Sequence, residues 1–245
     1  MFKSVLRVII VTLSICSLPL SAQAASWCKL PGKINIKIIP EMSQLKYDYT
    51  KSFTDLSKVK LNSTPYGSKA ITHTFGLANG QFRIEHKVRF QLLTNPNTNE
   101  TCIWYDSIDV NMKMNPLIMI AKEYRKGGCH FKEVMVHEQQ HIAVDKQVTN
   151  EYAQKLGQTL LQEVTKTSLY GPFPSSQTTF YQNKMQDTLN KLVTLNNDAM
   201  MTERSKRQAV IDSKTNYDAI SKKLHDVCDK KSPLTVKRVQ KKLKY

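Results

Sequence analysis

The sequence contains no Cys-x-x-Cys pair, no internal repeat and no low-complexity tract. The first absence argues against a metal site built from cysteines, because such sites take sulfur ligands from closely spaced pairs. The other two favour a single domain. Acidic residues are also scarce, with 20 Asp and Glu against 36 Lys and Arg. A balance this basic favours anionic surroundings, such as lipid headgroups, an acidic polymer or nucleic acid, although charge alone names no partner.

Residues 1–24 have the composition of a secretory signal peptide. A basic start precedes an apolar run over residues 8–20, which ends near the small-x-small site Ala22-Gln23-Ala24. The run is short for a bilayer, so cleavage after this site is favoured over an uncleaved anchor. Cleavage lowers Lys plus Arg from 36 to 34 against 20 acids, which leaves a net charge of +14. We expect an exported protein, periplasmic or extracellular, with no transmembrane segment in the mature chain.

Four cysteines remain after cleavage: Cys28, Cys102, Cys129 and Cys228. An even number in an exported chain indicates two disulfides, for which the sequence allows three pairings. The pairing we favour joins Cys102 to Cys129 and Cys28 to Cys228. The first bond would connect a strand to the following helix, and the second would tie the two ends of the domain.

Alternating apolar and polar residues predict strands in the first half of the mature chain. The expected strands cover residues 34–38, 47–53, 82–92, 102–114 and 117–121, with a turn at Thr64-Pro65-Tyr66-Gly67. The strands at 82–92 and 102–114 are separated by a short polar turn, which predicts an antiparallel hairpin.

After Lys126-Gly127-Gly128 the apolar spacing changes to threes and fours, which predicts a long helix over residues 131–169. A proline-rich turn then precedes a second helix over residues 177–227, and the two helices should pack as an antiparallel hairpin. We therefore expect one α+β domain, residues 25–229, with a small antiparallel sheet packed against a long antiparallel helical hairpin. The tail, residues 230–245, has seven basic residues and no acid. It is either a solvated end or a contact to an anionic envelope surface.

The motif with the clearest chemistry is His137-Glu138-Gln139-Gln140-His141, within the first long helix. Two histidines four residues apart share one helix face, so both imidazoles can bind one metal ion. Glu138 lies about 100° around the helix, where it can reach a water held by the metal. These residues predict a Zn²⁺ site with His137 and His141 as ligands and Glu138 as the catalytic base.

The third ligand must come from elsewhere, and several carboxylates compete. Asp145 is on the same helix, but a rise of about 1.5 Å per residue puts it roughly 12 Å from the first histidine. It could instead accept a hydrogen bond from the inner ring nitrogen of His141. If the chain turns around residues 171–174, position 141 lies opposite Glu203, which is therefore the predicted ligand. His86, on the apolar face of a strand, is the alternative.

The motif His137-Glu138-x-x-His141 resembles the active site of the zincin metallopeptidases. That resemblance implies an antiparallel sheet before the motif helix, whose edge strand aligns the substrate. A glutamate ligand from a later helix would be similar to the gluzincins, whereas the Gly and third His of the metzincins are absent. The layout also resembles small secreted bacterial proteins described as zinc-dependent proteases. Those proteins share a cysteine before the motif helix and a later run, echoed here by Arg207-Gln208, Ile211-Asp212, Tyr217 and Cys228.

Three functions are compatible with these patterns. The one we favour is an exported zinc peptidase that acts on protein or peptide substrates, with nucleic acid an unlikely partner. The second is a non-catalytic, basic, exported binding protein with a structural or degenerate metal site. The third is a helical-hairpin adaptor that binds no metal.

Overall fold

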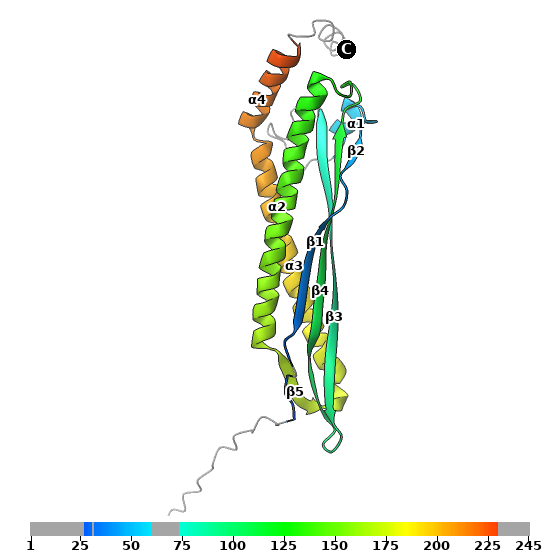
Figure 1. Cartoon of the computed structure of the whole chain (residues 1–245), viewed down its shortest axis with the longest axis vertical. Helices are drawn as coiled ribbons and strands as arrows, with labels where there is room; N and C mark the ends of the chain where they lie inside the picture. The colour runs from blue at the N-terminus through cyan, green and yellow to red at the C-terminus, as the bar shows by residue number, and fades with distance from the viewer. Residues whose placement is uncertain (1–26, 31, 60–73, 230–245) are drawn as a thin grey trace, which may run out of the picture.

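The strand β4 (Glu100–Ile120) is the centre of the sheet, and every other described strand pairs with it. The computed structural model describes residues 27–30, 32–59 and 74–229. In it, β3 (Gly76–Asn95) pairs with β4 along its whole length (Figure 1). On the other side of β4, three short strands follow one another: β5 (Leu169–Pro174), β1 (Asn35–Met42) and β2 (Lys46–Asp48). The sheet is therefore long and narrow.

The prediction of an α+β protein with a small antiparallel sheet is wrong, because the sheet is mixed. β1 and β2 run parallel to β4, whereas β3 and β5 run antiparallel to it. Alternation of apolar residues determines which side chains share a face, but it carries no information on strand direction. The chain is a mixed α/β protein that contains the expected β3–β4 hairpin.

Two long antiparallel helices cover one face of this sheet (Figure 1). α2 (Cys129–Lys166) begins after Gly128, and α3 (Thr178–Ile211) runs back beside it. The segment between them, predicted as a turn, forms β5 and the short 3₁₀ helix η1 (Ser175–Gln177). The two helices are therefore joined by a strand of the sheet.

The predicted second helix does not continue to residue 227. α3 ends at Ile211, and the Ser213 side chain caps a separate helix, α4 (Lys214–Lys223). A π-helical segment, η2 (Leu224–Asp229), follows. Similarly, the strand predicted at 47–53 is shorter, and residues Phe53–Ser57 form the helix α1.

The core lies between β4 and the two long helices. Ile108, Val110 and Met112 alternate along β4 and are at most 1 % exposed. They pack against buried residues of α2 and α3, including Leu156, Leu160, Met185 and Leu189. The strand period of two and the helix period of 3.6 thus bury a common apolar layer.

The disulfides join Cys28 to Cys102 and Cys129 to Cys228, with Cα–Cα distances of 6.0 and 5.5 Å. The predicted pairing is therefore wrong. Cys102 lies at the beginning of β4, whereas Cys129 follows the end of this strand. At about 3.3 Å per residue, β4 separates them by on the order of 60 Å.

Three predicted segments lie outside the described residues: the signal peptide (1–24), the turn at Thr64–Gly67 and the basic tail (230–245). They remain predictions. Among the residues that the structure does describe, no helix is long and apolar enough to cross a membrane.

Replacing Leu156 by Ala should lower the free energy of unfolding by about 2–5 kcal/mol, because this fully buried side chain would leave a cavity. The matched control is Leu161→Ala on the same helix, where the side chain is 59 % exposed and a change within about 0.5 kcal/mol is expected. Urea denaturation followed by circular dichroism measures both. Equal losses would contradict the face that α2 presents to the sheet.

Candidate metal centre

His137 and His141 lie one turn apart on α2, with their ring centroids 4.8 Å apart. Their Nε2 atoms are separated by 3.2 Å and face the C-terminal end of α3. Both side chains are largely buried, at 13 % and 10 % exposure. The helix spacing thus brings the two imidazoles together as the sequence predicts.

The third group at this point is Asp212. Its Oδ1 atom is 3.3 Å from Nε2 of His137 and 3.1 Å from Nε2 of His141. The potential ligand atoms of the three residues all lie within 4.8 Å of one another. Burial raises the pKa of Asp212, but the two imidazoles outweigh it and lower the pKa to about 2. The carboxylate is thus held in its charged form.

Local structure explains why Asp212 reaches the histidines. It is the residue at which α3 ends, and the adjacent Ser213 accepts a hydrogen bond from the backbone of Asn216 to start α4. The chain therefore changes direction at Asp212. A serine that caps a new helix was the sequence signal for this break, and it could have placed Asp212 at a helix end.

Glu203, the predicted third ligand, lies outside the cluster and pairs with Arg207 at 2.7 Å. Arg207 also binds Glu151 of α2. The predicted register was wrong because it assumed a symmetrical turn at residues 171–174. With β5 between the helices, His141 instead faces Gln208, five residues beyond Glu203.

Gln208 holds His141 in a defined orientation. Its Oε1 accepts a hydrogen bond from Nδ1 of His141, while its Nε2 donates to the His141 carbonyl, at 3.0 Å, and to Asp145. Asp145 in turn accepts two hydrogen bonds from Arg204, at 2.7 and 3.0 Å. A proton on Nδ1 leaves the lone pair of Nε2 directed to the cluster. The predicted contact of Asp145 with the His141 ring is therefore made by Gln208, and Asp145 acts one step further away.

The two histidines differ in how their surroundings act on their rings. Burial lowers the pKa of His141, but contacts with Asp212, Glu138 and Gln208 outweigh it and raise the pKa overall. Nδ1 of His137 is buried and has no hydrogen-bond partner among the described residues. The orientation of His137 is therefore set by packing and by the groups that its Nε2 faces.

Glu138 is 4 % exposed and lies between the cluster and β3. The backbone amide of Ala78 donates a hydrogen bond to its carboxylate. Burial raises the pKa of Glu138 to about 7, partly opposed by the neighbouring His137 and His141. A metal ion here would add positive charge and favour the ionised carboxylate.

The other described histidines lie away from the cluster. Nε2 of His86 is 2.8 Å from Oδ1 of Asn190 on α3, so the alternative ligand is a partly exposed histidine that is hydrogen-bonded away from the cluster. His130 pairs with Asp229, and His225 is exposed beside Asp226.

Two imidazole nitrogens and one carboxylate form a donor set that could hold a divalent metal ion. The fixed tautomer of His141 and the ionised Asp212 both fit such an ion. No family model, no curated protein and no solved structure matches the chain. The resemblance to zincins therefore rests on the motif and its neighbours in the sequence.

Replacing Gly76 by Ala should destabilise the protein by about 1–3 kcal/mol through overpacking. A Cβ atom at Gly76 would lie 2.5 Å from Cγ1 of Val134 and 2.7 Å from Oε1 of Glu138, so one of them must move. The control is Gly157→Ala in α2, where the nearest atom is 3.5 Å away and helix propensity predicts a gain of about 0.5–1 kcal/mol. Denaturant midpoints compare the two, and an equally stable Gly76→Ala variant would contradict the close approach of β3 to α2.

Proposed function

We propose that the chain is an exported zinc-dependent peptidase that hydrolyses peptide bonds in protein or peptide substrates. The observation that carries this proposal is the convergence of His137, His141 and Asp212 beside the buried carboxylate of Glu138. Three protein ligands, an open position and an adjacent carboxylate are the arrangement of hydrolytic zinc sites.

A zinc ion bound here would lower the pKa of a bound water molecule and would polarise the scissile carbonyl. The side chains of His137, His141 and Asp212 would hold the ion, and Gln208 keeps the His141 ring oriented. The carboxylate of Glu138 accepts a proton from the attacking water and transfers it to the leaving amine. The Ala78 amide keeps that carboxylate beside the cluster.

We propose that the substrate binds in an extended conformation along β3. The backbone carbonyl of Phe75 accepts a hydrogen bond from the amide of Ala121, just after β4. In this region the backbone N–H and C=O groups of odd-numbered residues therefore point to β4. The Ala78 amide consequently points away from β4, which agrees with its bond to Glu138. Among the described strands, none pairs with this outer side of β3. Unpaired backbone groups there can bind an extended peptide by strand addition.

Export is supported by the two disulfides, since such bonds persist in oxidising compartments. Contact of the basic tail with an anionic envelope surface remains a prediction about residues outside the described part of the chain.

Protein purified without a histidine tag should contain about one zinc per chain by elemental mass spectrometry. The variants His137→Ala, His141→Ala and Asp212→Ala should each lose most of it, because each removes a ligand. Glu203→Ala is the control and should retain the wild-type content. Loss of zinc from Glu203→Ala but not from Asp212→Ala would overturn the ligand set.

Replacing Glu138 by Gln should reduce hydrolysis of a fluorescently labelled unfolded protein by about 10²–10⁴-fold, because the amide cannot accept the proton. Zinc content and the circular dichroism spectrum should be unchanged. Glu203→Gln serves as the control with wild-type activity. Activity that survives in Glu138→Gln would exclude this residue as the base, and a zinc-loaded wild-type chain without hydrolysis would exclude the peptidase.

A further inference from the structure

The three groups of the metal cluster differ in how firmly the fold holds them. His137 and His141 belong to α2, which packs on the sheet along its length. Asp212 instead lies at the junction between α3 and α4. α4 has no buried residue of its own, whereas η2, which follows it, buries Leu224 and Cys228. The position of the segment that leaves Asp212 therefore depends on where η2 is attached.

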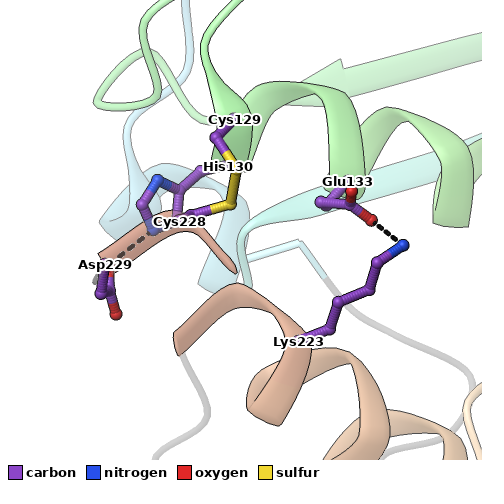
Figure 2. The surroundings of a disulfide bond; sticks show 6 residues. All are labelled: Cys129, His130, Glu133, Lys223, Cys228 and Asp229. Atoms are coloured by element: carbon purple, nitrogen blue, oxygen red, sulfur yellow. Dashed lines mark hydrogen bonds and ion pairs between the residues drawn. A yellow bond between two sulfur atoms is a disulfide. The ribbon is translucent and has the colours of Figure 1, made fainter. Parts of the chain in front are cut away.

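Residues 223–229, which we call the latch, are attached to the first five residues of α2 (Figure 2). Cys228 forms the disulfide with Cys129, the first residue of α2. Nζ of Lys223 lies 2.6 Å from Oε2 of Glu133. Nε2 of His130 lies 2.8 Å from Oδ1 of Asp229. All three links reach residues 129–133, one to two turns before the first histidine of the cluster.

We propose that Cys129 and Cys228 are positioning residues for Asp212, so that the centre reaches its full metal affinity only when this disulfide is closed. Cys129 precedes His137 by eight residues, and Cys228 follows Asp212 by sixteen. With a metal bound, the chain would form a closed ring. The disulfide would join residues 129 and 228, the metal would join His137 to Asp212, and the start of α2 and the segment from α4 to η2 would make up the two sides. Such a ring raises the effective concentration of the Asp212 carboxylate at the metal. This inference rests on the metal centre of the proposed function.

The two ion pairs hold the latch less firmly than the disulfide does. The Lys223 side chain is 57 % exposed, and an ion pair with a solvent-exposed, flexible partner contributes little. The pair of His130 and Asp229 is charged on both sides only when the imidazole is protonated. α4 is ten residues long and buries none of its side chains, so apolar burial does little to hold it in place. Opening the disulfide should therefore let α4 and the latch separate from α2, while α3 remains packed.

This dependence links metal binding to the thiol state of the chain. Closing the bond removes two electrons and two protons from the thiols of Cys129 and Cys228. A disulfide oxidant accepts them and becomes a dithiol. The chain would then bind metal tightly only after it has met such an oxidant.

The second disulfide provides a matched control. Cys102 lies in the part of β4 that pairs with β5, at the register shift between Thr101 and Ile103 and at the opposite end of the sheet from the start of α2. Removing the bond between Cys28 and Cys102 also deletes one long-range crosslink, but it leaves the latch unchanged. A general effect of losing a disulfide can therefore be separated from an effect on Asp212.

The experiment measures zinc affinity by competition with a chromophoric chelator, in the full mature chain. Cys129→Ser/Cys228→Ser should bind zinc roughly 10- to 100-fold more weakly than wild type, the range typical for groups that orient a ligand. Cys28→Ser/Cys102→Ser should stay within about twofold of wild type, because its crosslink lies far from the centre. Equal affinities for the two double variants would overturn the inference and leave the metal site intact. A wild-type chain that binds no zinc would overturn both this inference and the proposed function.

A coupling test excludes a general defect in folding. In an Asp212→Asn background, the Cys129→Ser/Cys228→Ser change should lose most of its effect on zinc affinity, because the disulfide acts through that carboxylate. Hydrogen exchange on the metal-free proteins gives a second measure: amides of α4 and η2 should exchange faster in this double variant, while those of α2 beyond its first turns should not. An undiminished effect in the Asp212→Asn background, or unchanged exchange in α4, would contradict the positioning role.

Discussion

The buried ion pair of Asp145 and Arg204 sets the alignment on which the rest of the structure depends. Asp145 is 1 % exposed and bonds both to the guanidinium of Arg204 and to the amide of Gln208. Sliding α3 by one turn would leave this carboxylate buried without its partner, at a cost of about 3–5 kcal/mol. The pair therefore disfavours other registers of the helical hairpin. In the register that it selects, the end of α3 brings Asp212 to the two histidines.

Two glycines of β3 allow the sheet to accept the buried carboxylates of α2. Gly76 lies beside Glu138 and Gly80 beside Asp145, and a Cβ atom at either position would come within 2.7 Å of a carboxylate oxygen. Glu138 is the proposed catalytic base and Asp145 aligns the two helices, yet each carboxylate fits only because the facing residue of β3 is a glycine. The geometry of the centre is thus shared between α2, α3 and the edge of the sheet.

The sequence predicts the features that depend on a local pattern of residues, and it does not predict those that depend on contacts between distant segments. Spacing of four residues places His137 and His141 together whatever surrounds the helix, and alternation identifies β3 and β4 with their hairpin. The direction of β1, the strand hidden in Leu169–Pro174 and the pairing of the cysteines depend on tertiary contacts that no local period encodes. The residue opposite His141 was misplaced for the same reason, since an error of five residues in the helical register exchanges Gln208 for Glu203 and leaves Asp212, at the end of α3, out of the prediction.

Pro116 separates two of the strands that pair along one side of β4, namely β1 and β2. The backbone carbonyl of Met114 accepts a hydrogen bond from the amide of Ser43, just after β1. The even-numbered residues in this part of β4 therefore point their backbone N–H and C=O groups to the side on which β1 and β2 lie. Proline has no amide hydrogen, and at position 116 its ring faces that side between the last pair of β1 and the first pair of β2. A strand pairing here cannot extend past this point, so the chain leaves β4 after Met42 and returns at Lys46. One proline ring thereby separates the part of this edge that pairs with β1 from the part that pairs with β2.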